Sequence, residues 1–71
     1  MSFKEERELE AMPESIARLE EEQHRLHATL ADPEFYKGAG AEIVTINARL
    51  ESLELELERA FQRWEDLEAL K

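Results

Sequence analysis

Apolar residues recur along most of the chain at alternating steps of three and four, and charged or small polar residues fill the positions between them. This spacing places the apolar side chains on one face of a helix, and its average of 3.5 predicts left-handed coiled-coil packing. Gln23 is the one polar residue on this seam. The seam positions are Leu9, Met12, Ile16, Leu19, Gln23, Leu26 and Leu30, followed by Ile43, Ile46, Leu50, Leu53, Leu57, Ala60, Trp64 and Leu67.

The first half of the chain predicts two helical segments separated by a kink. Ser2 and Glu5 have the spacing of a capping box, so a helix is expected over residues 2–11. Pro13 has no amide hydrogen and its ring opposes a preceding helical turn, which predicts a break just before it. Because proline is also favoured in the first turn of a helix, a second helix is expected over residues 13–31.

A loop over residues 32–41 is expected to join this part to a long final helix. Asp32 followed by Pro33 can start one further helical turn. Gly38 and Gly40, the two glycines of the chain, indicate a flexible connection. The sequence from there on contains neither Gly nor Pro, which predicts a helix over residues 42–70.

The fold class is therefore predicted as all-α: an antiparallel two-helix coiled-coil hairpin with a short kinked N-terminal helix, monomeric and forming a single domain over residues 1–71. Heptads on both sides of a loop are also compatible with an intermolecular dimer or tetramer. We favour the hairpin because of the loop glycines and the interior proline. The helix still follows its heptad at Lys71, so we expect the chain to be a piece from the C-terminus of a larger protein.

Two registers fit the loop length. The first places Met12 beside Trp64 and Glu22 near Glu56. The second slides by one heptad and leaves Trp64 near Glu5. It would pair Glu22 with Arg49 and Glu8 with Arg63. We favour the first register, because burial of a large apolar side chain stabilises more than an exposed ion pair.

Length and composition narrow the function classes. A chain of 71 residues buries a small core, and without cysteine it has neither disulfides nor thiolate chemistry. No apolar run reaches the ~18 residues of a membrane span, so we expect a cytoplasmic chain without membrane contact. The net charge of −9 opposes a general electrostatic grip on nucleic acid or anionic lipid.

Candidate chemistry is sparse, and we expect the chain to be non-catalytic, with no metal and no cofactor of its own. His24 and His27 share a helix face with Glu20 and Glu21, but no further ligand stands at a fixed spacing, and solvated imidazoles are the simpler interpretation. General acid–base work needs a desolvated pair of groups in a cleft, which a two-helix hairpin hardly provides. No phosphate-binding glycine loop is present.

The basic residues are arranged less randomly. Lys4, Arg18 and Arg25 fall on one line along the first half, where they form a narrow ridge suited to phosphates. The simpler interpretation is a solvated face, in which Glu14 pairs with Arg18 and Glu21 pairs with Arg25. Four apolar residues lie off the seam, and they are either scattered surface residues or docking points. These four are Val44, Leu55, Phe61 and Leu70.

Three stretches carry a family resemblance: SFKEERELEAMPESIARLEEE at the start, LADPEFY in the middle and FQRWEDLEAL near the end. In this order the chain resembles the C-terminal coiled-coil domain of Uup-type ABC-F ATP-binding proteins. The resemblance implies a cytoplasmic parent protein with two ATP-binding cassettes, in which ATP binds to the parent and the hairpin supports its work by contacting DNA, RNA or the ribosome. It implies no catalytic residue here.

Three functions follow as hypotheses. The first is weak, sequence-independent binding of DNA or other nucleic acid. The second is docking onto the ATP-binding domains of the parent or onto a protein partner. The third is an RNA-facing helical extension like those of some aminoacyl-tRNA synthetases. The candidate phosphate contacts are Lys4, Arg7, Arg18, Arg25, Lys37, Arg49, Arg59 and Arg63.

Overall fold

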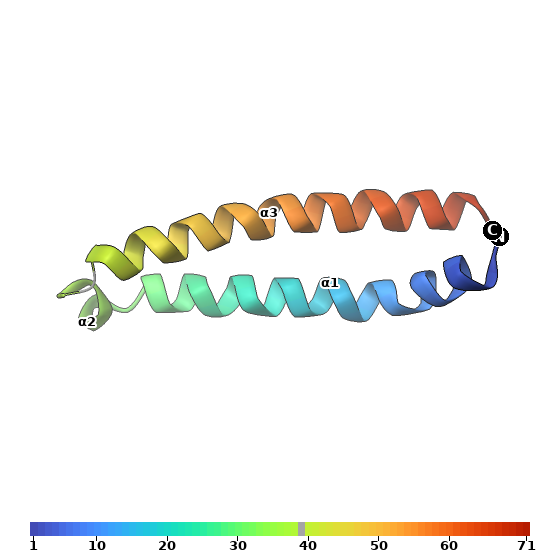
Figure 1. Cartoon of the computed structure of the whole chain (residues 1–71). Helices are drawn as coiled ribbons and strands as arrows, with labels where there is room; N and C mark the ends of the chain where they lie inside the picture. The colour runs from blue at the N-terminus through green and yellow to red at the C-terminus, as the bar shows by residue number, and fades with distance from the viewer. Residues whose placement is uncertain (39) are drawn as a thin grey trace.

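The protein is a hairpin of two long antiparallel helices. The computed structural model describes residues 1–38 and 40–71. Helix α1 (Phe3–Leu30) runs alongside helix α3 (Gly40–Ala69), and a single turn, α2 (Pro33–Tyr36), forms the tip between them (Figure 1). The molecule measures 52 × 15 × 15 Å, and both termini lie at the end opposite the tip. The predicted all-α hairpin is confirmed.

The start of α1 is fixed by the capping box that the sequence predicts. The amide of Glu5 donates to Ser2 Oγ at 3.2 Å, and the amide of Ser2 donates to Glu5 Oε1 at 2.9 Å. These two bonds satisfy donors that the first helical turn would otherwise leave free. The hydrogen bond from the Ser2 backbone also lowers the pKa of the Glu5 carboxyl.

We had expected Pro13 to divide the first half into two helices, over residues 2–11 and 13–31, and this prediction is wrong. α1 continues without interruption through Pro13, whose ring lies on the exposed side. Leu9, Met12 and Ile16 are buried on either side of it. Their packing against α3 holds the helix together at the position where proline removes one hydrogen bond.

The tip contains the extra turn that Asp32 and Pro33 predict. The Asp32 side chain accepts from the amide of Glu34 at 3.0 Å, and Pro33 occupies the first helical position of α2. Part of the expected connection, Ala39, lies outside the described residues. α3 begins two residues earlier than predicted, at Gly40, and neither glycine adopts a positive φ.

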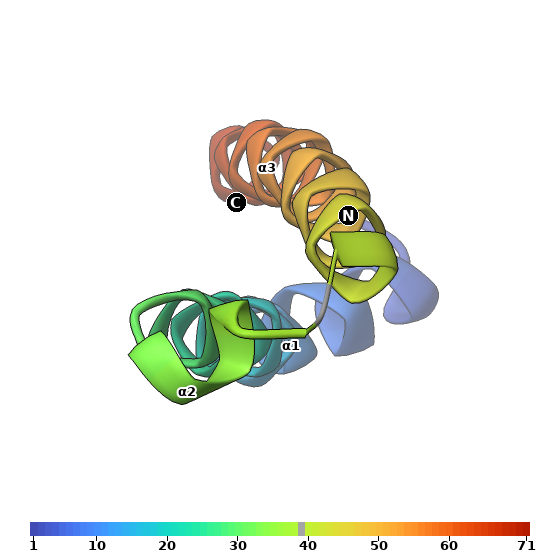
Figure 2. The ribbon, with the colours of Figure 1, turned by 90° about the vertical axis from the view of Figure 1, so that its left-hand side faces the viewer.

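The core lies along the seam between α1 and α3. Leu53 and Leu67 are fully buried, and removing such a side chain from water contributes about 2 kcal/mol each. Trp64 packs against the core cluster from one side. Figure 2 views the hairpin from the tip, with α1 and α3 seen nearly end-on beside each other; the contacts between long elements are those of α1 with α3. The buried cluster contains Leu9, Met12, Ile16, Leu57 and Leu67, with Leu19, Ala60 and Trp64 packed against it.

The cross-helix ion pairs discriminate between the two registers. Arg49 contacts Glu22 and Arg63 contacts Glu8, which are the two pairs of the second register. Trp64 packs against the apolar cluster that contains Met12. Burial of Trp64 therefore does not exclude these ion pairs, and the expectation that the first register would replace them is wrong.

Candidate nucleic-acid interface

The predicted basic ridge lies on α1 and is exposed. Lys4, Arg18 and Arg25 all belong to the exposed residues. Arg18 Nη2 donates to Glu14 Oε1 at 2.8 Å, which confirms this predicted pair. The expected pair between Glu21 and Arg25 does not form among the described residues. Arg18, the middle cation of the ridge, is thus held in an ion pair, while Lys4 and Arg25 form none among the described residues.

Arg49 lies at the helix–helix edge and bridges two carboxylates. Its Nε and Nη2 donate to the two carboxylate oxygens of Glu22, at 2.6 and 2.9 Å, across the hairpin. Its Nη1 lies 3.2 Å from Glu56 Oε2 on its own helix. That oxygen is buried, and Arg49 is the cation that faces it. Glu22 on α1 and Glu56 on α3 thus share one guanidinium.

Arg63 makes the second cross-helix pair. Its Nε and Nη2 donate to the two oxygens of Glu8 at 2.7 and 2.9 Å. Two parallel bonds of this kind fix direction as well as distance. We call this pair and the Glu22–Arg49–Glu56 group the arginine clamps. Both stand at the same heptad position, g, and so on one flank of the seam.

The clamps shift the pKa values of the groups that form them. Hydrogen bonds from Arg49 lower the pKa of the Glu22 carboxyl, and those from Arg63 lower the pKa of Glu8. The same bonds raise the pKa of both guanidiniums. A phosphate that approached Arg49 or Arg63 would have to compete with a carboxylate already bound to it.

The remaining candidates are spread over the length of the hairpin. The Arg7 guanidinium lies 5.6 Å from the centre of the Phe3 ring, in cation–π geometry. Lys37 Nζ lies 3.3 Å from Glu34 Oε1 at the tip. Arg59 is exposed on α3 and makes no ion pair within the described part of the chain. The eight basic residues therefore do not converge on one surface.

Neither histidine takes part in a metal site that the described residues could form. His24 and His27 are both exposed on α1. Over residues 1–38 and 40–71, no group of three His, Cys, Asp or Glu side chains lies close enough to hold a metal ion. In the same ranges, no helix is both long and apolar enough to cross a membrane.

One surface emerges more clearly from the structure than from the heptad pattern. A groove runs along α3 between Ala48 and Phe61. Leu55 and Phe61, two of the four off-seam apolar residues, line it together with Glu58. The sequence did contain an indication of this groove, because glutamates stand three or four residues from these apolar positions and therefore close to them on a helix. Their common groove becomes visible when the seam is oriented against α1.

Comparison with known proteins identifies the family. The sequence profile described as "ABC transporter C-terminal domain" matches residues 1–69. An "ATP-binding protein Uup-like" of Haemophilus influenzae is 45% identical over 74 residues, which cover 100% of this chain and 16% of that protein. The "ATP-binding protein Uup" of Escherichia coli is 39% identical over 71 residues, covering 100% of this chain and 11% of that protein.

The "ATP-binding protein Uup" of Haemophilus influenzae is 45% identical over 74 residues, again with 100% of this chain and 11% of that protein covered. The chain thus spans about a tenth to a sixth of the length of these relatives. No solved structure matches it significantly. Since the family profile extends over nearly the whole chain, the protein belongs to the ABC transporter C-terminal domain family.

Proposed function

We propose that this hairpin is a non-catalytic accessory domain of a larger cytoplasmic ABC-type ATPase and acts mainly by docking onto protein. Three named ATP-binding proteins match the chain over its full length, and it accounts for a small share of each. In this proposal ATP binds to and is hydrolysed by other parts of the parent. The hairpin contributes a stiff surface for contact with the ATP-binding domains or with a protein partner.

The observation that carries the docking function is the state of the basic residues. Within residues 1–38 and 40–71, five of the nine Lys and Arg side chains are engaged in ion pairs, and the chain as a whole carries a charge of −9. A surface that binds phosphates through its field needs free positive charge, which this hairpin has in few places. The five engaged residues are Arg18, Lys37, Arg49, Arg63 and Lys71.

A weak nucleic-acid contact is the second candidate, and one observation favours it. Lys4, Arg7, Arg25 and Arg59 make no ion pair among the described residues. On duplex DNA each phosphate contact contributes about −0.9 to the slope of log affinity against log salt. The ridge of three cations therefore allows a slope of about −3 at most. Binding would be indifferent to base sequence, and any contact of the parent with RNA or the ribosome would use the same cations.

Two measurements test the proposal. The rate of ATP hydrolysis is compared for the whole parent, for the parent without the hairpin, and for the hairpin alone. We expect the shortened parent to remain an ATPase and the hairpin alone to be inactive. ATP hydrolysis by the hairpin, or loss of nucleotide binding by the shortened parent, would refute an accessory role.

The second measurement titrates labelled duplex and single strands with the hairpin at low salt, where screening is weakest. The docking function predicts little binding. Salt-sensitive binding that disappears in the Arg18→Glu/Arg25→Glu variant would instead establish the ridge as the working surface. Both substitutions lie away from the buried seam, so helicity by circular dichroism should stay unchanged and serves as the control.

A further inference from the structure

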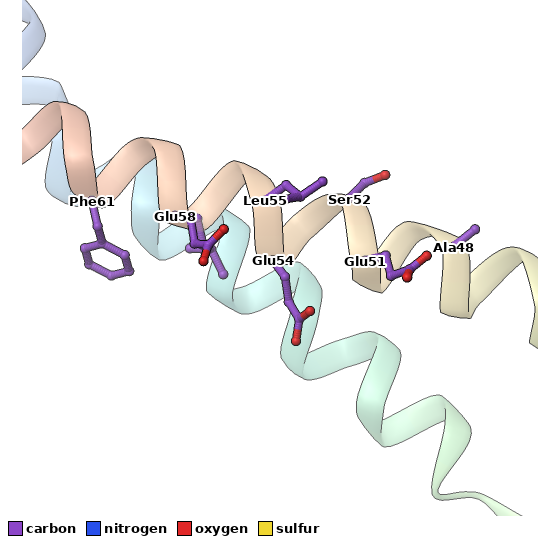
Figure 3. A pocket seen from close by; sticks show the side chains of 8 residues that line it. Ala48, Glu51, Ser52, Glu54, Leu55, Glu58 and Phe61 are labelled. Atoms are coloured by element: carbon purple, nitrogen blue, oxygen red, sulfur yellow. The ribbon is translucent and has the colours of Figure 1, made fainter.

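The two flanks of the seam differ in what they offer to a partner. The arginine clamps close one flank, at heptad position g. Glu54 and Phe61 occupy position e, which lies on the other side of the seam. This second flank borders the groove on α3 (Figure 3). One flank is therefore cross-linked by ion pairs, and the described residues form no such pair across the other.

The groove gives direct access to apolar surface. Leu55 is 52% exposed and Phe61 is 45% exposed, although both are large apolar side chains. Leu57 also lines the groove, and it belongs to the buried core cluster. Because Leu57 is itself buried, a partner seated here would rest mainly on Leu55 and Phe61.

Three carboxylates surround this apolar surface. Glu51, Glu54 and Glu58 project from the same stretch of α3 as Leu55 and Phe61 (Figure 3). None of the three makes an ion pair within the described residues. Glu54 and Glu58 stand four residues apart, a spacing at which like charges repel on a helix. A cation placed between them would relieve this repulsion.

We propose that this groove is the docking site of a basic amphipathic helix from a protein partner, a proposal that rests on the docking function above. The groove spans residues 48–61, which is about 20 Å of helix and matches roughly four turns of a partner. Apolar side chains at i, i+3, i+4 and i+7 would pack on the exposed Leu55 and Phe61, while flanking Lys or Arg would meet the carboxylates.

Charge excludes two other occupants. A second copy of this chain would bring the same glutamates to the contact, and it carries the same net charge of −9. A nucleic-acid strand would place phosphates against three carboxylates. Only a cationic partner gains from the acidic rim, and the field of the whole hairpin would also accelerate its encounter.

A labelled model peptide tests the site. The peptide is an 18-residue helix with Leu at i, i+3, i+4 and i+7 and Lys at the flanking positions. One control peptide has the same composition with its Leu residues scattered over all faces, and a second has Glu in place of Lys. We expect the 71-residue chain to bind the first peptide in the micromolar range, by fluorescence anisotropy near physiological salt. Both control peptides should bind at least tenfold more weakly.

Variants of the hairpin locate the contact. Leu55→Asn/Phe61→Asn changes only exposed apolar side chains and should weaken peptide binding at least tenfold. A triple reversal of the rim should weaken it to a similar extent. A matched reversal of three exposed glutamates outside the groove, with the same net charge, should leave affinity within about twofold. The rim variant is Glu51→Lys/Glu54→Lys/Glu58→Lys, and the matched control is Glu20→Lys/Glu21→Lys/Glu42→Lys.

Several results would overturn the proposal. Equal weakening by the rim variant and its matched control would show general attraction between opposite charges. Binding that is insensitive to Leu55 and Phe61, or equal for the scattered peptide, would exclude the groove as an apolar site. If a labelled single strand of nucleic acid bound and the peptide did not, the ligand of this surface would be nucleic acid and not a protein helix. Circular dichroism of each variant confirms that the hairpin is folded. A parent that needs its hairpin while the peptide fails would reject the groove alone and leave the accessory function intact.

Discussion

Replacement of Leu53 by alanine provides the most direct test of the seam. Leu53 is fully buried in the middle of α3, while Leu55, two residues further along the same helix, is 52% exposed. Leu→Ala removes the same atoms at both positions. Alanine and leucine are both strong helix formers, so the two substitutions share any effect on the helix itself. The difference between them isolates burial against α1.

The magnitude follows from the burial of each side chain. Leu→Ala in protein cores costs about 2–5 kcal/mol, the sum of lost transfer energy and the cavity left behind. Because a two-helix seam can close partly around a gap, we expect about 3 kcal/mol for Leu53→Ala. We expect less than about 0.5 kcal/mol for Leu55→Ala. For 71 residues the total free energy of unfolding should be roughly 4–10 kcal/mol, so Leu53→Ala removes a large share of it.

Urea unfolding followed by circular dichroism measures both variants at one protein concentration. Equal slopes of free energy against urea would show that the unfolded states are comparable. The two midpoints should then differ strongly, with the Leu55→Ala curve close to wild type. If both variants lost the same stability, Leu53 would not face α1 in solution, and the seam as described would be refuted.

Three further predictions concern the polar seam position, the clamps and the assembly. The half-buried Gln23 makes no side-chain hydrogen bond among the described residues, so Gln23→Leu should raise Tm in a thermal melt; a clear fall would reveal a partner for its amide. Because the folded chain lowers the pKa of Glu22, its contribution is complete above the ordinary value of 4.5 and is lost as pH falls through the lower folded pKa. The Tm difference between wild type and Glu22→Gln should therefore be present at pH 7 and vanish at strongly acid pH, and a constant difference would contradict the clamp. In sedimentation equilibrium at micromolar concentration the chain should have the 8.3 kDa mass of a monomer, and a stable dimer would count against the intramolecular hairpin.

The helices were predictable because their burial imposes a spacing that is visible in the sequence. Successive residues of one seam must stand three or four positions apart, and the apolar residues in both halves of the chain have this spacing. The effect of Pro13 was not predictable from its local chemistry. A missing hydrogen bond predicts a break, but the outcome depended on the packing of Leu9, Met12 and Ile16 in one cluster with Leu57 and Leu67, which lie more than forty residues further along the chain.

The clamps show a second limit of pattern reasoning. Heptad positions describe where helical backbones lie, and they treat ion pairs as markers of one register. An arginine side chain is long enough to reach a carboxylate beyond its nearest neighbours, as Arg49 does when it contacts both Glu22 and Glu56. The basic residues were all visible in the sequence, but which of them remain free for a ligand depended on this reach.

Because the two termini lie at the same end of the hairpin, a rotation about that end moves the opposite end furthest. The opposite end is α2, at the far side of a body 52 Å long (Figure 1). A rigid-body tilt of about 10° at the base would sweep the tip through roughly 9 Å. That tip carries Phe35 and Tyr36 with their rings edge to face, 6.5 Å apart. A small rotation at the base would thus displace an aromatic pair by more than the 6.5 Å between its ring centroids.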